Sequence, residues 1–277
     1  MKEVRVGNIA IGDSGQLVLI AGPCVIESET SALKMAEEIR RITEKLDIPF
    51  IYKSSYLKDN RSSIKSYQGP GLEKGLKILS KVKSEIGVPV LSDVHSVEQV
   101  KPASEVLDVL QIPAYLSMQT QLALEVGRYA RAVNIKKGQF LDPGDIENTI
   151  GKIESVGNHN IMLTERGTCF GYHNLVVDFR SLPVMRALGY PVIFDVTHSV
   201  RVYGISSSDP EGGRPEFVPF LARAGVAAGC EAVFIETHHD VSRALCDASS
   251  MWPLQKLENL IKQLKEIHEI VRKYKRI

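Results

Sequence analysis

The sequence contains 277 residues, of which 44% are hydrophobic and 24% are charged, and its formal net charge is +1. This composition is typical of a globular protein, and the balanced charge argues against a general nucleic-acid or anionic-membrane surface. No stretch approaches the ~18 consecutive apolar residues of a membrane-spanning helix, and the N-terminus lacks an apolar run of signal-peptide length. We therefore expect a cytoplasmic protein without membrane or nucleic-acid partners.

Strand-like and helix-like segments alternate along the chain. Residues 3–12 alternate apolar and polar side chains around Gly7-Asn8, which predicts a short hairpin within residues 1–15. Apolar, strand-like runs follow at 17–21, 49–53, 88–93, 106–112, 132–136, 161–165, 191–196 and 232–236. Apolar side chains at helical spacing predict helices at 33–42, 76–82, 143–153, 182–188, 217–228 and 254–271.

This alternation of eight strands with helices within about 260 residues is the pattern of a (β/α)8 TIM barrel, whose usual size is ~250 residues. A doubly wound open sheet has the same alternation but usually carries a Gly-x-Gly-x-x-Gly turn after its first strand. Here the first strand is followed by Gly22-Pro23-Cys24 instead. Because no repeat, low-complexity tract or linker divides the sequence, we expect one α/β barrel domain spanning residues 1–277.

The predicted strands end in titratable or polar residues, and in a TIM barrel the carboxyl ends of the strands carry the chemistry. A surface salt bridge explains any one of these residues, but packing does not explain the set. In strand order they are Cys24; Lys53, Lys58, Asn60 and Arg61; Asp93 and His95; Gln111; Lys136, Lys137 and Gln139; Glu165 and Arg166; Asp195 and His198; Glu236, His238 and His239, followed by Asp247. The irregular stretch 201–215 follows the seventh strand, so we expect a mobile loop over this face.

The cations of this set predict an anion-binding rim in a protein of almost no net charge. They are Lys53, Lys58, Arg61, Lys136, Lys137 and Arg166. Arginine offers a bidentate fork for phosphate or carboxylate, and lysine offers a point charge. The segment 60–63 adds amide and hydroxyl donors of the kind that a phosphate pocket uses. A substrate pair with two anionic groups would match this rim.

Cys24 has two interpretations. Free cysteine is among the most buried residue types, so packing alone accounts for a thiol at the end of a strand. Alternatively, Cys24 forms a divalent-metal set from three adjacent strands with His198, Glu236 and Asp247. Competing histidine ligands are His95, His238 and His239. The absence of a Cys-x-x-Cys pair is typical of a reducing compartment, and we interpret the remaining thiols as core or near-surface groups: Cys169, Cys230 and Cys246.

Long, ordered segments of the chain resemble the 3-deoxy-D-manno-octulosonate 8-phosphate synthase family from about residue 17 to residue 257. They read IAGPCVIES, YKSSYLKDNRSS, KKGQF, TERGTCFGYHNLVVDFRSLP, DVTHSV, GGRPEF and CDASS. The resemblance implies a (β/α)8 barrel whose N-terminal face is closed by a short hairpin, commonly assembled as a homotetramer. It also implies the transferase reaction of lipopolysaccharide biosynthesis that condenses phosphoenolpyruvate with arabinose 5-phosphate and water and releases phosphate.

The same resemblance implies roles for individual residues. Metal-independent members have asparagine where Cys24 stands, so this chain resembles the metal-dependent class, whose ligands match Cys24, His198, Glu236 and Asp247. The ion would be Zn²⁺, Fe²⁺ or Mn²⁺, because mixed sulfur, nitrogen and oxygen ligands do not select sharply among them. Phosphoenolpyruvate would be held by Lys53, Lys58, Lys136, Gln139 and Arg166. Arabinose 5-phosphate would be held by Asn60, Arg61 and Ser62. Asp93 is a further predicted substrate contact, and the predicted catalytic residues are Cys24, Lys58, His198 and Asp247.

Two alternatives stay open at this point. The sister synthase that uses erythrose 4-phosphate shares the barrel, the Gly-Pro-Cys turn and the metal set, but it typically reads Lys-Pro-Arg-Thr where this sequence reads Lys53-Ser54-Ser55. A non-catalytic barrel that senses sugar phosphates would tolerate the loss of a ligand or cation, and none of the expected ones is missing here. Asp59 stands where alanine is common beside the phosphate pocket, and we expect it to face solvent.

Overall fold

Eight parallel strands lie in chain order around a closed barrel. A computed structural model describes residues 1–12, 15–61, 63–170 and 173–274. The barrel strands in these ranges are β3 (Val18–Gly22), β4 (Phe50–Lys53), β5 (Val90–Asp93), β6 (Val109–Ile112), β7 (Ala132–Lys136), β8 (Ile161–Glu165), β9 (Val192–Asp195) and β10 (Ala232–His238). Strand β10 pairs with β3 on one side and with β9 on the other, which closes the barrel and confirms the predicted fold. A two-residue strand, β11 (Trp252–Pro253), pairs with the end of β10.

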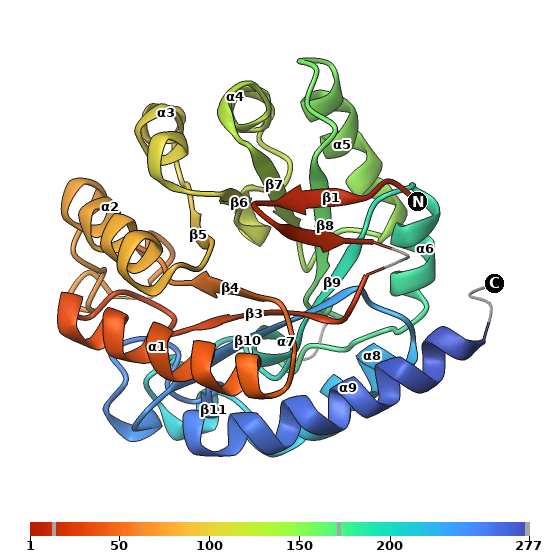
Figure 1. Ribbon diagram of the computed structural model, residues 1–277. Helices are drawn as coiled ribbons and strands as arrows, with labels where there is room; N and C mark the ends of the chain where they lie inside the picture. The colour runs from red at the N-terminus through yellow and green to blue at the C-terminus, as the bar shows by residue number, and fades with distance from the viewer. Residues whose placement is uncertain (13–14, 62, 171–172, 275–277) are drawn as a thin grey trace.

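A hairpin closes the N-terminal end of the barrel, as predicted. Strand β1 (Val4–Val6) pairs with the antiparallel strand β2 (Ile9–Ile11) across a two-residue turn, in which Gly7 has a φ of 59°. Figure 1 shows this hairpin lying across the barrel near β8. Its four isoleucine and valine side chains join the inward-facing apolar side chains of the barrel strands in one buried cluster. The backbone N–H of Arg5 donates to Oδ1 of Asn160 at 3.0 Å, which fastens the hairpin to the loop before β8.

Helices cover the outside of the barrel (Figure 1). They are α1 (Glu29–Lys45), α2 (Leu72–Lys81), α3 (Val97–Val106), α4 (Thr120–Tyr129), α5 (Glu147–Glu154), α6 (Ser181–Ala187), α7 (Val196–Ser199), α8 (Val218–Ala227) and α9 (Leu257–Lys273). Their apolar faces pack on the outward-facing side chains of the strands in a second, larger cluster. Within the described ranges, no helix combines the length and the apolar character that crossing a membrane requires.

Three helices, α3, α4 and the four-residue α7, are absent from the helices that the spacing predicts. Helix α3 contains Pro102, which interrupts a helical pattern. Helix α4 contains Gly127, at which a Cβ would lie 2.6 Å from Cγ2 of Val156, so the close packing of α4 against α5 needs glycine there. Both α3 and α4 bury a short apolar stripe despite these residues. Tertiary packing therefore stabilises segments whose local pattern is weak.

Candidate active site and metal centre

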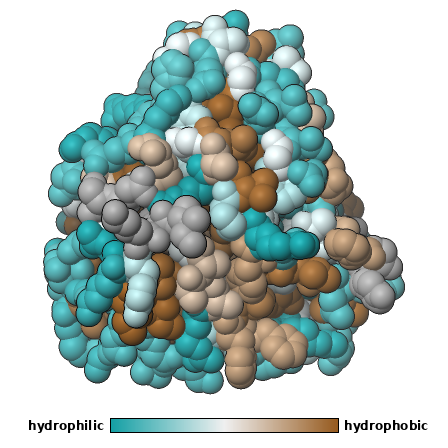
Figure 2. Space-filling view, turned by 90° about the vertical axis from the view of Figure 1, so that its right-hand side faces the viewer, coloured by the Kyte–Doolittle hydropathy of each residue, from teal (hydrophilic) through white to brown (hydrophobic). Residues whose placement is uncertain are grey.

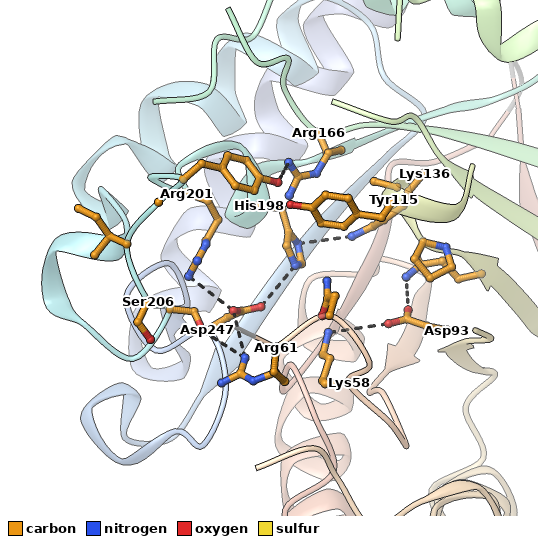
Figure 3. A pocket seen from close by; sticks show the side chains of 18 of the residues that line it. Lys58, Arg61, Asp93, Tyr115, Lys136, Arg166, His198, Arg201, Ser206 and Asp247 are labelled. Carbon is orange, nitrogen blue, oxygen red and sulfur yellow. Dashed lines mark hydrogen bonds and ion pairs between the residues drawn. The ribbon is translucent and has the colours of Figure 1, made fainter. Parts of the chain in front are cut away.

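A cavity of about 310 Å³ opens at the carboxyl ends of the barrel strands. Cationic side chains from six described positions line it: Lys53, Lys58, Arg61, Lys136, Arg166 and Arg201. Five of these belong to the predicted rim. Tyr115 and the segment 203–207 form a further part of the wall, so the stretch 201–215 covers the site as its place after the seventh strand predicts. Figure 3 shows Arg61, Arg201 and His198 converging on Asp247 from different sides.

Gly22 shapes the end of β3 next to this cavity. A Cβ at this position would lie 2.1 Å from the carbonyl oxygen of Lys53, so only glycine lets the ends of β3 and β4 approach so closely. After Pro23 the chain reaches Cys24, whose side chain is fully buried. The thiol lies against Asp247, which itself lines the cavity. The Gly-Pro turn therefore delivers the thiol to the site.

The four predicted metal ligands come together at one side of the cavity. Sγ of Cys24 lies 3.2 Å from Oδ2 of Asp247, and Nε2 of His198 lies 3.7 Å from both that oxygen and Oε1 of Glu236. Asp247 thus links two overlapping donor groups, one with Cys24 and one with His198 and Glu236. The backbone of Asp247 is left-handed, with a φ of 49°. Such a conformation costs energy in a residue with a Cβ and is found preferentially at functional sites.

This donor set fits a divalent metal ion. It offers thiolate sulfur, imidazole nitrogen and carboxylate oxygen, the atoms that bind zinc and similar ions. Oε2 of Glu236 is buried and has no hydrogen-bond partner among the described residues. A buried polar atom without a partner is unfavourable, and a bound cation at this point would satisfy it.

Cys246 joins the same cluster, which the sequence did not indicate. Its side chain is buried, in agreement with the interpretation as a core thiol. However, its Sγ lies 2.8 Å from Sγ of Cys24 and 2.9 Å from Nη1 of Arg61. The only signal in the sequence is its position next to Asp247, and the direction of a side chain in an irregular segment cannot be derived from that position.

Buried carboxylates hold the lysines at the base of the cavity. Nζ of Lys53 donates to Oε1 of Glu236 at 2.8 Å, and Nζ of Lys58 lies 3.8 Å from Oδ2 of Asp93. Burial opposes ionisation of Asp93, but the charges of Lys53 and Lys58 outweigh it and hold its pKa well below the ordinary value. Burial also opposes the charge on Lys58, yet Cys24 and Asp93 raise its pKa well above the ordinary value. Both partners therefore stay charged at neutral pH.

Asp195 joins the cationic side of the site to the metal side. Its Oδ2 accepts hydrogen bonds from Nζ of Lys136 at 2.5 Å and from Nδ1 of His198 at 2.9 Å. Burial opposes the charge on Asp195, but His198 and Lys136 hold its pKa well below the ordinary value. Burial lowers the pKa of Lys136 even though Asp195 counteracts it. One buried carboxylate thus serves two functional side chains.

Sequence reasoning missed two polar residues of the outer wall. Nη1 of Arg201 lies 3.5 Å from Oδ1 of Asp247, and the hydroxyl of Tyr203 accepts a hydrogen bond from Nη1 of Arg166 at 2.8 Å. Both residues begin the stretch 201–215, which was predicted to cover the active face. The predicted position of this loop over the site is the signal by which Arg201 and Tyr203 could have been found, because side chains at the start of such a loop lie next to the site.

The structure brings most of the predicted site residues together. The following line the cavity: Lys53, Lys58, Asn60, Arg61, Asp93, Lys136, Arg166, His198 and Asp247. Cys24 and Glu236 lie buried next to it. Gln139 is buried but is not among the residues that line the cavity, and its Oε1 has no partner in the described part of the chain. Ser62 lies outside the described residues, and Asp59 is exposed as expected.

Lys137 does not belong to the rim, contrary to the prediction. Its Nζ donates to the carbonyl oxygen of Gly138 at 3.3 Å and to Oγ1 of Thr168 at 3.1 Å. Successive residues along a strand point to opposite sides, so Lys136 and its neighbour could not both face the cavity. Two of the competing histidines pair with other carboxylates, His238 with Glu27 and His239 with Glu38. The third, His95, belongs to neither donor group of the described residues.

Comparison with known proteins agrees with this arrangement. The model of the DAHP synthetase I family matches residues 2–273. A protein of Geobacter metallireducens named 2-dehydro-3-deoxyphosphooctonate aldolase is 54% identical over 271 residues, which cover 98% of this chain and 99% of the relative. Proteins of the same name from Geobacter sulfurreducens and Geotalea uraniireducens are 52% identical over 271 residues and 54% identical over 272 residues, covering 98% of this chain and 99% and 100% of the relatives.

Proposed function

The chain belongs to the DAHP synthetase I family, and on that basis we propose that it is a 3-deoxy-8-phosphooctulonate synthase. This enzyme condenses phosphoenolpyruvate with D-arabinose 5-phosphate and water to 3-deoxy-D-manno-octulosonate 8-phosphate and inorganic phosphate. The name carried by the relatives, 2-dehydro-3-deoxyphosphooctonate aldolase, denotes the same enzyme. The observation that carries the proposal is the set of cationic side chains around a cavity that adjoins the metal-ligand cluster.

Charge compensation is the first task of this site. Both substrates carry a phosphate, and phosphoenolpyruvate carries a carboxylate as well, so the two repel each other in solution. We assign phosphoenolpyruvate to Lys53, Lys58, Lys136 and Arg166, with Gln139 as a further predicted contact. Holding both anions at reacting distance replaces their repulsion by fixed positive charge and removes the entropic cost of their encounter.

The sugar phosphate is assigned to the loop after β4. Asn60, Arg61 and Ser62 would bind arabinose 5-phosphate, with the guanidinium of Arg61 on its phosphate. Nη1 of Arg61 lies 3.1 Å from Oγ of Ser207, so an anion at this point would find a guanidinium and a hydroxyl side by side. The ionised carboxylate of Asp93 at the base of the cavity is a suitable acceptor for a sugar hydroxyl.

The reaction forms one carbon–carbon bond and one carbon–oxygen bond, to water, and breaks the carbon–oxygen bond between C2 and phosphate. C3 of phosphoenolpyruvate bonds to the aldehyde carbon of the sugar, water adds at C2, and the hemiketal phosphate then loses phosphate from C2. The aldehyde oxygen gains negative charge as the first bond forms. Lys58 is protonated in this environment and is suited to donate a hydrogen bond to that oxygen.

The metal ligands in this proposal are Cys24, His198, Glu236 and Asp247. A divalent ion held there would orient the aldehyde or the attacking water. Zn²⁺, Fe²⁺ and Mn²⁺ are all compatible with a set of one sulfur, one nitrogen and two carboxylate ligands. The protein's own part is to keep these side chains close. The surrounding cations lower the pKa of the carboxyl groups of Glu236 and Asp247 despite their burial. Burial raises the pKa of the Cys24 thiol, so this ligand would release its proton when the ion binds.

A second candidate function is the condensation with erythrose 4-phosphate, favoured by the name of the matching family model. Phosphate release from phosphoenolpyruvate by the metal-loaded protein, measured with each aldehyde in turn, decides between the two. We expect faster release with arabinose 5-phosphate. Faster release with erythrose 4-phosphate would identify the sister activity, and no release with either aldehyde would favour a non-catalytic barrel. Treatment with a chelator should abolish turnover, and added Zn²⁺ or Mn²⁺ should restore it.

We also propose that the chain assembles into a homotetramer. Figure 2 shows apolar residues gathered in the lower part of one side of the molecule, bordered by hydrophilic ones. In the described chain, Phe217 and Phe220 at α8 are 51% and 64% exposed and line a hollow of about 290 Å³. Large exposed aromatic side chains of this kind are typical of surfaces that another protein covers. Light scattering coupled to size-exclusion chromatography tests the stoichiometry.

A further inference from the structure

Asp195 is the buried carboxylate at the end of β9, and its side chain lies between two functional groups. It is fully inaccessible to solvent. Its Oδ1 accepts the backbone N–H of His198 at 3.0 Å, which caps the short helix α7. Its Oδ2 accepts from Nδ1 of His198 at 2.9 Å and from Nζ of Lys136 at 2.5 Å. The carboxylate therefore fixes both the backbone and the ring of His198 while it also holds the ammonium group of Lys136.

The contact with Asp195 decides which nitrogen of His198 is free. A carboxylate only accepts hydrogen bonds, so Nδ1 carries the proton and Nε2 carries the lone pair. Nε2 is the atom that lies 3.7 Å from both Glu236 and Asp247. An acceptor on the far nitrogen of a metal-binding histidine orients the ring and raises its basicity, and loss of such an acceptor typically costs about 10- to 100-fold in metal affinity.

Lys136 and His198 share this one acceptor. Nζ of Lys136 lies 3.4 Å from Nδ1 of His198, and since both carry protons at this point they compete for Oδ2 of Asp195. Lys136 also lines the cavity, where an anionic substrate group would form an ion pair with its ammonium group. An anion bound to Lys136 would weaken the hydrogen bond from Lys136 to Asp195. The carboxylate of Asp195 would then accept a stronger hydrogen bond from His198.

We propose that Asp195 is a positioning residue that couples binding of phosphoenolpyruvate at Lys136 to binding of the metal ion at His198. This inference rests on the proposed function for the identity of the anion. Phosphoenolpyruvate strengthens the hydrogen bond from His198 to Asp195 and thereby tightens the metal. Because coupling between two sites is reciprocal, the metal tightens phosphoenolpyruvate by the same factor.

The affinity for Zn²⁺, measured against a chromophoric chelator with and without saturating phosphoenolpyruvate, tests this coupling without turnover. We expect phosphoenolpyruvate to tighten Zn²⁺ binding by about fivefold or more in the unmodified protein. In Asp195→Asn the effect should disappear, Zn²⁺ affinity should fall about 10- to 100-fold, and the KM for phosphoenolpyruvate should rise. Asp108→Asn is the matched control, since Asp108 is a buried carboxylate that binds Lys83 and the backbone of Val90 instead.

Several results would overturn the coupling. Equal Zn²⁺ affinity with and without phosphoenolpyruvate in the unmodified protein would do so, and so would full coupling in Asp195→Asn, which would mean that the substrate touches the metal directly. If Asp195→Asn does not fold, Lys136→Met replaces it and should bind Zn²⁺ with no response to phosphoenolpyruvate. Coupling without turnover would refute the proposed function alone, and turnover without coupling would refute only this inference.

Discussion

The two ends of the barrel are built from the same strands but use opposite chemistry. At the N-terminal end, the hairpin β1–β2 and the first halves of the strands bury isoleucine, valine and leucine side chains in one apolar cluster. At the carboxyl end, inward-facing positions of the same sheet are occupied by Lys53, Asp93, Lys136, Asp195 and Glu236, all of them buried. A single strand such as β4 changes from apolar packing to a buried ammonium group over four residues.

This difference assigns stability to one end and chemistry to the other. Burying apolar surface contributes roughly 25 cal/mol for each Å², whereas taking charged groups out of water costs free energy that ion pairing offsets only in good geometry. The apolar end therefore stabilises a fold that can hold a costly cluster of charges at the mouth. Substitutions at the two ends should separate the free energy of unfolding from activity.

The largest expected effect lies at the mouth, with Cys24→Asn. The substitution removes the thiolate from the metal-ligand cluster, so we expect the protein to lose its bound metal and most of its activity. Any remaining turnover should be insensitive to EDTA, because the resemblance places asparagine at this position in metal-independent enzymes. Metal content by atomic emission and phosphate release before and after chelation measure both effects.

Cys169→Ser is the control for Cys24→Asn, since Cys169 is an exposed thiol outside both donor groups. It should retain metal and activity. Unchanged metal content in Cys24→Asn would remove this residue from the ligand set. A large loss of unfolding free energy in Cys24→Asn would instead break the separation of stability from chemistry.

At the opposite end, Ile11→Ala should destabilise the fold and leave the chemistry intact. Ile11 is fully buried between the hairpin and the barrel interior. We expect the free energy of unfolding to fall by about 2–5 kcal/mol, with kcat and both KM values unchanged. Urea unfolding measures the first quantity and steady-state kinetics the second. Ile270→Ala removes the same atoms from a side chain that is 54% exposed and should change neither; a changed kcat in Ile11→Ala would contradict the division between the two ends.

Arg61→Ala should distinguish the binding of the two substrates at the carboxyl end of the barrel. The substitution removes the guanidinium that we assign to the sugar phosphate, and a hydrogen bond to a charged group contributes about 1.5–3 kcal/mol. This corresponds to a fall of about 10- to 150-fold in kcat/KM for arabinose 5-phosphate. The KM for phosphoenolpyruvate should change little and serves as an internal control. Arg180→Ala, at an exposed Arg180 paired with Asp178, should have no effect. An equal rise in both KM values would reject the assignment.

The division between the two ends was largely predictable from the sequence. Apolar, β-branched runs that stop at titratable residues predict both the barrel and the polar mouth, because strand ends of one barrel must meet at one face. Helices α3 and α4 escaped prediction since Pro102 and Gly127 weaken their local pattern. Lys137 was wrongly included in the rim, although the alternation of side chains along a strand distinguishes it from Lys136.

The metal-ligand cluster was harder to predict from the sequence than the barrel and its polar end. Cys24, His198 and Glu236 follow from strand ends, but Asp247 lies beyond β10 in an irregular segment. Its placement depends on a left-handed backbone and on ion pairs with Arg61 and Arg201, none of which leaves a local signal in the sequence. Asp247 entered the predicted set as a carboxylate a short way beyond the eighth strand, and the resemblance to the metal-dependent enzymes then supported it. The neighbouring Cys246 had no such support and was interpreted as a core thiol.

The smallest expected effect concerns Glu154, an ionised group at the apolar end. Its Oε1 accepts hydrogen bonds from Nζ of Lys2 at 2.8 Å and from the hydroxyl of Tyr190, and these two bonds lower its pKa to about 2. A carboxyl group whose pKa is lower in the folded than in the unfolded state stabilises the fold above its unfolded pKa, and this contribution is lost as the pH falls towards the folded pKa. Glu154→Gln should therefore lower the free energy of unfolding by about 1 kcal/mol or less at neutral pH, because the pair is partly exposed.

The difference in unfolding free energy between the unmodified protein and Glu154→Gln should shrink between about pH 4.5 and about pH 2. Urea midpoints across that range measure it. Glu105→Gln, on the exposed side of α3, serves as the matched control. A difference that stays constant down to the acid limit would show that Glu154 contributes through packing rather than through its charge, and the apolar end would then have no ionic component of its own.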